Sequence, residues 1–233
     1  MEAWWVLFPS ITSKGGLYDV FQTNRVCGHC RGCLLAGGDA MRVLVACEFS
    51  GIVRDAFIRR GHDAWSCDLL PTERPGPHIQ DDVLKHLEGW DMIIAHPPCT
   101  FLANSGARWL FEKEGRWEQL AKACEFFNVF LNAPAKFIAV ENPMPHKWAT
   151  EKIGKYNFKV HPWEHGHKQK KTTCFWVRNL PCLLPSAMVG PPPKNDKTWE
   201  SIWREPPGKD QSKNRSRTFT GIAKAIADQW SNL

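Results

Sequence analysis

Short, mostly apolar runs alternate with longer stretches of helical periodicity along much of the chain. Four such runs predict β-strands, at 42–47, 63–67, 91–95 and 136–140. Between them, apolar residues at helical spacing predict helices near 52–60 and at 112–132. Strands that alternate with helices are typical of a mostly parallel, doubly wound sheet covered on both faces. The pattern therefore predicts an α/β fold.

The pattern changes after residue 172. Residues 173–177 predict one more strand. Residues 181–217 are rich in Pro, Lys and Trp and have no sustained period, which indicates a long loop region. In 219–230, apolar residues from Ile222 to Trp230 form one stripe, which predicts a closing helix packed on the core.

Residues 1–40 do not share this alternation, and the strand at 42–47 begins abruptly after them. We therefore predict that 1–40 is a leader of uncertain structure, with Met41 as the natural start. The rest of the 233-residue chain, 41–233, is long enough for one α/β domain with a sizeable core.

Composition places the chain among ordinary globular proteins, with 43% hydrophobic and 23% charged residues. No stretch approaches the roughly 20 apolar residues of a membrane span, so we expect no membrane association. Most of the nine cysteines lie singly in apolar runs. This usage indicates reduced thiols and a cytoplasmic location rather than a disulfide framework.

Cys27, Cys30 and Cys33 are the exception, because their C-x-x-C-x-x-C spacing is able to bind zinc or an iron–sulfur cluster. A closed site needs a fourth ligand, and His29 lies inside the loop, where it is poorly placed to serve. We therefore predict no metal site here, with an unstructured or untranslated leader as the simpler interpretation.

Positive charge is concentrated in one segment. The whole chain carries a net charge of +6, and residues 144–178 hold eight Lys or Arg against two Glu. A basic strip of this kind suits phosphate binding, because each neutralised phosphate releases condensed counterions. A solvated lysine-rich face is the alternative.

Three short strings carry candidate chemistry: HPPC at 96–99, ENP at 141–143 and QKK at 169–171. They supply a thiol nucleophile, a carboxylic acid, and amide and cationic support. The first two follow predicted strands, and in parallel sheets ligands bind at the carboxyl ends of the strands. We therefore expect the strings to lie together at one edge of the sheet.

A second feature of that edge is the turn at 48–51, where the first strand passes into the first helix. A strand–turn–helix that opens a parallel sheet is a docking place for nucleotide-like ligands. Asp68 ends the next strand about twenty residues later, where a carboxylate commonly accepts hydrogen bonds from ribose hydroxyls. Turn or cap carboxylates are the alternative interpretation of Asp68 and of Asp82.

Taken in this order, the turn and the three strings resemble the cytosine-5 DNA methyltransferases, and in particular their small phage and prophage members. The resemblance extends over residues 41–233. It implies the Rossmann-like fold of adenosylmethionine-dependent methyltransferases. This sequence departs from the family in the turn after the first strand. The family has an F-x-G-x-G-G turn with three glycines, whereas this turn has only Gly51.

The resemblance also implies S-adenosylmethionine as cofactor. Phe49 and Gly51 would border its methionine and adenosine parts, Asp68 its ribose and Asp82 its adenine amine. Glu48 would face its ammonium group. Pro97 would also lie at the cofactor. The predicted cofactor-binding residues are Glu48, Phe49, Gly51, Asp68, Asp82 and Pro97.

On the substrate side, the resemblance makes Cys99 the nucleophile that adds to carbon 6 of cytosine and Glu141 the acid at nitrogen 3. We expect the basic segment and a helix N-terminus near residue 105 to lower the pKa of Cys99. We expect partial burial to raise the pKa of Glu141.

The family's Q-x-R-x-R string corresponds to residues 169–173. Gln169 matches, Lys171 stands at the first arginine and Thr173 at the second. Lysine keeps the charge but lacks the planar fork of arginine. Gln169, Lys170 and Lys171 are therefore predicted to contact DNA, and Lys171 also to support catalysis.

A large target-recognition domain is missing, since 181–217 is the only region available for one. In this reduced recognition region, Trp199 and Trp203 are predicted to stack on bases. Phosphates would be held by a set of cations: Lys194, Lys197, Arg204, Arg215 and Arg217. We expect a short sequence preference, or a partner protein that supplies recognition.

The main prediction is an adenosylmethionine-dependent DNA cytosine-5 methyltransferase, acting in the cytoplasm of a bacterium or a phage-infected cell, for example in restriction–modification. Two alternatives remain. The same chemistry on a free cytosine nucleotide needs no recognition domain, and a catalytically inactive DNA-binding relative would retain only the fold.

Overall fold

The computed structural model describes residues 40–233, so the predictions made for 1–39, including the cysteines at 27–33, lie outside the described residues. A seven-stranded sheet runs through the described part, in the order β3-β2-β1-β4-β5-β7-β6. The strands are β1 (Arg42–Ala46), β2 (Asp63–Asp68), β3 (His78–Gln80), β4 (Met92–Ala95), β5 (Phe137–Pro143), β6 (Phe158–Val160) and β7 (Thr173–Arg178).

Strand directions identify the fold. β1 pairs in parallel with β2 and β4, β2 with β3, and β4 with β5. β7 is antiparallel to both of its neighbours, β5 and β6. A mostly parallel sheet in this order, with β7 reversed, is the Rossmann-like sheet of adenosylmethionine-dependent methyltransferases. The predicted fold class is confirmed.

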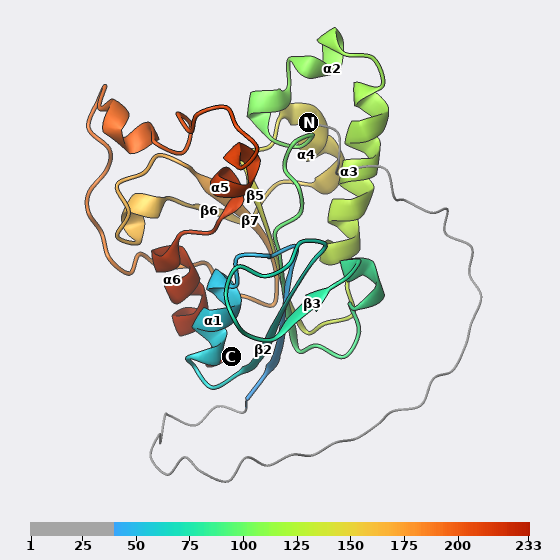
Figure 1. Cartoon of the computed structure of the whole chain (residues 1–233), viewed down its shortest axis with the longest axis vertical. Coiled ribbons are helices and arrows are strands. Elements are labelled where there is room, and N and C mark those ends of the chain that lie inside the picture. Colours follow the sequence, from blue (N-terminus) through green and yellow to red (C-terminus); the bar gives the residue numbers. More distant parts are fainter. Residues whose placement is uncertain (1–39) are drawn as a thin grey trace, which may run out of the picture. The chain divides into compact units, whose positions relative to one another are not determined.

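Helices cover both faces of the sheet (Figure 1). The α-helices are α1 (Ile52–Ile58), α2 (Trp109–Glu112), α3 (Arg116–Leu131), α4 (Lys147–Ile153), α5 (Gln211–Ser216) and α6 (Thr220–Trp230). α1 and α6 pack together on one face, and α3 packs on β5 and β7 with α4 beside it.

The core between α1, α6 and the sheet is apolar and closely packed. Val43 and Val45 of β1, Phe57 of α1 and Ile226 of α6 are all completely buried. Trp230 ends α6, is also fully buried, and donates a hydrogen bond through Nε1 to the Pro181 carbonyl at 3.1 Å. The predicted closing helix is therefore a core helix.

Four expectations about local structure need correction. β5 continues to Pro143, so Glu141 lies inside a strand and not after it. The predicted helix 112–132 is divided, because Gly115, at φ 69°, separates α2 from α3. β3, β6 and α4 were not predicted, since each is too short to show a period. The region 181–217 is mostly loop but contains a 3₁₀ turn at Lys197–Glu200 and α5.

Among residues 40–233, no helix combines the length and the apolar character that crossing a lipid bilayer requires.

Candidate active site

The carboxyl end of β4 and the adjoining parts of β5 and β7 bring together residues from all three predicted strings. β5 lies between β4 and β7. A cavity of about 10 Å³, roughly the room for one water molecule, lies there. Its walls come from β4, β5, β7 and the start of α6: His96, Glu141, Lys171, Thr173, Phe175, Arg217, Thr218, Phe219 and Ile222.

Cys99 follows β4 in a half-buried loop, close enough to Glu141 and Lys171 for both to influence its ionisation. Burial raises the pKa of the thiol, and the Glu141 carboxylate raises it further, whereas the cations Lys171 and Arg215 oppose the rise. The expected lowering is therefore wrong in sum, because desolvation outweighs the positive charges. The expected helix N-terminus is only a 3₁₀ turn, Asn104–Gly106.

Glu141 is almost enclosed, with 14% of its side chain exposed, and its carboxylate is well supplied with partners. His96 Nδ1 lies 3.1 Å from Oε2, the Thr173 hydroxyl forms a second hydrogen bond, and the Lys171 ammonium is near. Burial pushes the pKa of Glu141 upward, but these contacts outweigh it and the pKa is lowered. The expected raised pKa is thus also wrong.

Lys171 is the member of the third string that reaches the cavity. Its Nζ donates a hydrogen bond to the backbone carbonyl of Arg215 at 2.9 Å. This contact ties the residue before β7 to the last turn of α5. Lys171 therefore places a positive charge near the Cys99 thiol and the Glu141 carboxylate.

Gln169 and Lys170 do not line the cavity. Gln169 Nε2 donates to the Ser201 hydroxyl at 2.7 Å, and Lys170 Nζ pairs with Glu200 at 3.1 Å. The Lys170 backbone amide also donates to the carbonyl of Trp199. These side chains anchor the turn at 197–200, and their contact with DNA stays a prediction.

The reduced recognition region is also less open than expected. Trp199 is 6% exposed and packed into the fold, so only Trp203, at 52%, is available for stacking. Arg204 pairs with Glu200, and Arg217 pairs with Glu73. Lys194, Lys197 and Arg215 are exposed.

The predicted cofactor residues converge at the carboxyl ends of β1 and β2. Asp68 and Asp82 both raise the pKa of the buried Cys47 thiol, after burial itself, which shows that the two carboxylates lie near the end of β1. Burial also raises the pKa of Asp68, whose Oδ1 accepts a hydrogen bond from the Leu70 amide at 2.9 Å. Asp82 caps the 3₁₀ turn Val83–Lys85.

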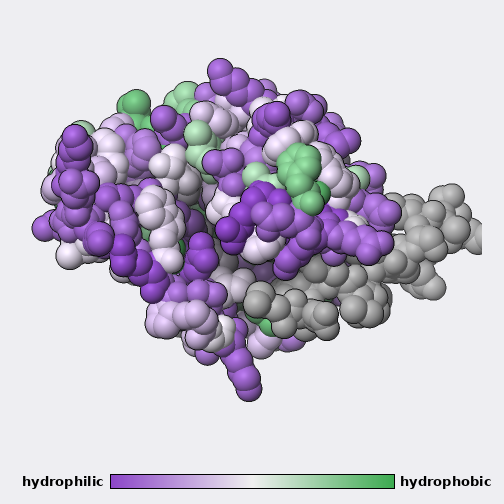
Figure 2. Space-filling model, turned by 90° about the horizontal axis from the view of Figure 1, so that it is seen from above, coloured by the Kyte–Doolittle hydropathy of each residue, from purple (hydrophilic) through white to green (hydrophobic). Residues whose placement is uncertain are grey.

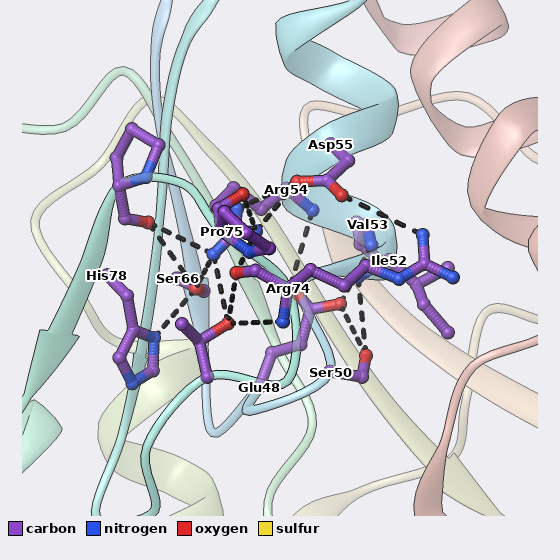
Figure 3. A network of polar contacts seen from close by, with 12 residues as sticks. Glu48, Ser50, Ile52, Val53, Arg54, Asp55, Ser66, Arg74, Pro75 and His78 are labelled. Carbon is purple, nitrogen blue, oxygen red and sulfur yellow. Dashed lines mark hydrogen bonds and ion pairs between the residues drawn. The ribbon is translucent and has the colours of Figure 1, made fainter.

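The turn after β1 is closed by Glu48, which is 4% exposed. Its Oε1 accepts hydrogen bonds from the Val53 amide at 2.7 Å and the Ser50 hydroxyl at 3.1 Å (Figure 3). The Arg54 amide donates to Oε2 at 3.3 Å. Glu48 therefore caps α1, and the predicted contact with an ammonium group would use its remaining lone pairs.

Arg54 is a fully buried arginine that fastens the loop between β2 and β3 to α1 (Figure 3). Its guanidinium donates to Asp55 and to the Ser66 hydroxyl. Further hydrogen bonds reach four groups of the loop, the Thr72 hydroxyl and the carbonyls of Arg74, Pro75 and Pro77. A Cβ at Gly51, which has φ 67°, would collide with this guanidinium, so the single glycine of the turn makes room for Arg54.

The donor set at this edge suits the nucleoside part of S-adenosylmethionine. Asp68 and Asp82 are able to accept hydrogen bonds from hydroxyl and amino groups, and Phe49 and Pro97 add buried apolar surface. The first amides of α1, in contrast, already have partners within the turn. The residues present therefore fit the ribose and adenine, with Asp68 and Asp82 as the groups that would hold them.

Three contributors were not predicted from the sequence. His96 belongs to the HPPC string, but its position in the sequence does not predict a contact with Glu141. Arg54 looks like an ordinary helix cation, and only its place directly after the turn marks it out. Arg217 was assigned to phosphate binding, whereas the fold places it in the cavity wall.

Comparison with known proteins gives similarity at the level of solved structures only. No protein-family model and no curated protein matches the chain. One similar structure is described as a DNA modification methyltransferase encoded within an E. coli prophage, with 16% identity over 66% of this chain and 53% of that one, at a TM-score of 0.42. Another is the 16S rRNA methylase RmtB, with 16% identity over 58% and 54%, at 0.32. The chain thus spans about half the length of these structures, and no residue role rests on them.

Proposed function

We propose that this protein transfers a methyl group from S-adenosylmethionine to carbon 5 of cytosine in DNA. The observation that supports this most is the grouping of Cys99, Glu141 and Lys171 at one end of the sheet, beside the carboxylates Asp68 and Asp82. A thiol, a carboxyl group and a cation at the cytosine, next to a nucleoside site, are the groups that this reaction needs.

The thiolate of Cys99 would start the reaction. Carbon 5 of cytosine is too weakly nucleophilic to accept a methyl group unaided. Addition of the sulfur to carbon 6 forms an S–C bond and pushes the electrons of the ring toward nitrogen 3, so carbon 5 becomes enamine-like. When bound, S-adenosylmethionine supplies an electrophilic methyl group to that carbon. Loss of the proton from carbon 5 then restores the double bond and releases the sulfur.

Lys171 and Glu141 would carry the charges of this sequence. The ammonium of Lys171 opposes the burial that disfavours the Cys99 thiolate. A protonated Glu141 would donate a hydrogen bond to nitrogen 3 and stabilise the charge that the addition creates. The Glu141 carboxylate influences the ionisation of the Cys99 thiol, and the two groups would act on opposite atoms of one ring, nitrogen 3 and carbon 6.

The cavity has room for about one water molecule, so the base needs additional space. Arg217, Thr218 and Phe219 form one wall, and Arg217 is held by Glu73 at 2.7 Å. Binding of a cytosine ring would therefore displace this segment. A cytosine within a duplex must also leave the stack, at a cost of a few kcal/mol.

DNA as the substrate is supported by the charge of the surface. Hydrophilic side chains dominate the face seen in Figure 2, and apolar groups are scattered on it. Within the basic segment five lysines are exposed: Lys147, Lys152, Lys155, Lys159 and Lys168. Exposed cations of this kind bind phosphates by counterion release.

A free cytosine nucleotide is a second candidate substrate, favoured by the reduced recognition region. Trp199 is buried, and Arg204 and Arg217 are paired with carboxylates, so few groups remain there to read a sequence. Salt separates the two candidates. A DNA enzyme should bind duplex with a steep dependence on salt concentration, whereas a nucleotide enzyme should lack a multi-phosphate slope.

Methyl transfer with labelled S-adenosylmethionine tests the proposal, using duplex DNA, single strands and dCMP as acceptors and mass spectrometry of the product base. We expect 5-methylcytosine in DNA, and a loss of at least about 10⁴-fold in Cys99→Ala, because the nucleophile is removed. Cys182→Ala is the matched control, since Cys182 is exposed and lies outside the cavity. Labelled product at another atom, or equal activity of Cys99→Ala, would contradict the proposal.

A further inference from the structure

His96 directly follows β4 and is built into the cavity. Its backbone amide donates to the carbonyl of Ala46 at 3.0 Å, which extends the pairing of β4 with β1. Only 9% of its side chain is exposed. Nδ1 lies 3.1 Å from Glu141 Oε2, while Nε2 is buried and has no hydrogen-bond partner in the part of the chain that the structure describes. Such an unpaired buried nitrogen calls for a functional explanation.

The chemistry of Glu141 raises a related question. Hydrogen bonds from His96 and Thr173, with the Lys171 charge, lower the pKa of Glu141, so the carboxyl group is ionised at neutral pH. An ionised carboxylate accepts a hydrogen bond but has no proton to give. The proton that neutralises nitrogen 3 must therefore come from another group.

We propose that His96 and Glu141 act as one acid–base pair, in which His96 supplies the proton that Glu141 passes to nitrogen 3 of the cytosine. This inference rests on the proposed function, and it makes His96 a positioning and proton-supplying residue that acts through Glu141. The geometry supports it, because Nδ1 is already within hydrogen-bond distance of the carboxylate oxygen.

The proton balance closes within the pair. As the Cys99 sulfur bonds to carbon 6, the ring electrons move to nitrogen 3. The Nδ1 proton of the imidazolium moves to the Glu141 carboxylate, and Glu141 passes one proton on to nitrogen 3. When the S–C bond breaks, nitrogen 3 returns its proton to Glu141, and Glu141 returns one to His96. The pair therefore borrows one proton and regains it in each cycle.

Among the side chains of the cavity wall, imidazole is the type suited to this exchange. Histidine gains and loses a proton near neutral pH, whereas the cations that face the site, Lys171, Arg215 and Arg217, hold theirs.

The pair predicts a particular dependence of kcat on pH. The reacting form needs an imidazolium and a thiolate at once. Between the titration of an imidazole and that of the Cys99 thiol, whose pKa burial raises, the gain in thiolate with rising pH offsets the loss of imidazolium. Log kcat should therefore rise at low pH and be flat between these titrations. If His96 only supports the fold, log kcat should instead keep rising with a slope of about 1 until the thiol titrates.

The experiment compares His96→Asn with the wild-type protein in methyl transfer from pH 5.5 to 9.5. Asparagine keeps a donor for Glu141 but cannot supply a proton. We expect kcat to fall about 100-fold near pH 7 and the flat region to be replaced by the rising slope. His62→Asn is the matched control, because His62 is also buried with an unpaired Nε2 but lies next to the start of β2, outside the cavity.

A double variant makes the test independent of folding defects. If the residues act as a unit, His96→Asn should cost little more in a Glu141→Gln background than Glu141→Gln costs alone. Additive losses, or a wild-type profile retained in His96→Asn, would overturn the pair and leave the proposed methyl transfer intact. A wild-type protein that methylates neither DNA nor dCMP would overturn both.

Discussion

At the turn after β1, the fully buried Arg54 has an oxygen partner for every nitrogen of its guanidinium, and the Glu48 carboxylate is filled by amides of α1. At the ends of β4 and β5, the nearly buried His96 has one nitrogen without a partner among residues 40–233, and the Cys99 thiol is held against ionisation. Both regions are polar and buried. The polar groups of the first region have their partners in the folded protein, whereas those of the second are in part unpaired.

This difference distinguishes groups that hold the site in shape from groups that are proposed to act in it. Paired buried groups hold the loop and the turn in one shape, because breaking such a network leaves unsatisfied charges and carbonyls. Unpaired groups cost stability in the resting protein, and functional sites commonly contain them. Variants in the two regions should therefore fail in different ways.

Arg54→Met should have the largest effect on stability. It would take one hydrogen-bond donor from each of the Arg74, Pro75 and Pro77 carbonyls, so we expect the free energy of unfolding to fall by about 3 kcal/mol. Urea denaturation measures this. Arg204→Met is the control, because its exposed pair with Glu200 should contribute at most about 0.5 kcal/mol. Equal losses in the two variants would remove the distinction between the regions.

Lys171→Met tests the region at the ends of β4 and β5. Its expected effect is smaller, and it concerns the reactivity of Cys99 and not the stability of the fold. Without the ammonium, the pKa of Cys99 should rise further, because burial and Glu141 would act unopposed. Alkylation of Cys99 by iodoacetamide at pH 8 should slow by up to roughly tenfold, the equivalent of about one pKa unit. Lys171→Arg should retain the wild-type rate, as should the exposed control Lys168→Met. Faster alkylation in Lys171→Met would contradict the electrostatic role.

Much of the fold was predictable, because each inner strand corresponds to an apolar run in the sequence. β1, β2, β4, β5 and β7 all coincide with predicted strands within a few residues. β3 and β6 have three residues each and lie at the sheet edges, where few apolar positions are needed. Burial of Trp199 was unforeseen for a related reason, since a single tryptophan in a loop has no period to reveal its partner.

The grouping of the three strings was predictable from the sequence, whereas the electrostatics of the candidate site were not. Cys99, Glu141 and Lys171 stand in recognisable strings, and their elements bring them together. The signs of the Cys99 and Glu141 pKa shifts depend on burial and on His96, which are properties of the fold and not of spacing. The contacts of Gln169 and Lys170 within the fold were not predictable for the same reason, because their partners lie about thirty residues away along the chain.

Glu73→Gln should give the smallest of these effects. Glu73 lies in the loop between β2 and β3 and pairs with Arg217 of the cavity wall. Arg217 and Lys213 lower the pKa of Glu73 to about 2. A carboxyl group whose pKa is lowered by folding stabilises the folded state at pH values above its ordinary pKa of ~4.3. This contribution is lost as the pH falls through the pKa of the folded state. We expect the variant to lose about 1 kcal/mol at pH 7, after allowance for screening, and progressively less between pH 4 and 2.

Denaturation at pH 7 and pH 3 checks this dependence. Glu88→Gln is the control, because Glu88 is exposed, and it should not change stability at either pH. A Glu73→Gln loss that is larger at pH 3 than at pH 7 would reverse the sign and rule out the ion pair as its source.

Covalent trapping tests the central claim most directly. The protein would be incubated with S-adenosylmethionine and DNA that contains 5-fluorocytosine, which cannot lose a proton from carbon 5 after methyl transfer. We predict a complex that resists denaturation, contains the methyl group, and maps to Cys99 by peptide mass spectrometry. It should be absent in Cys99→Ala and present in Cys182→Ala. Absence of any complex with the wild-type protein on duplex and single strands, or a complex through another residue, would contradict the account.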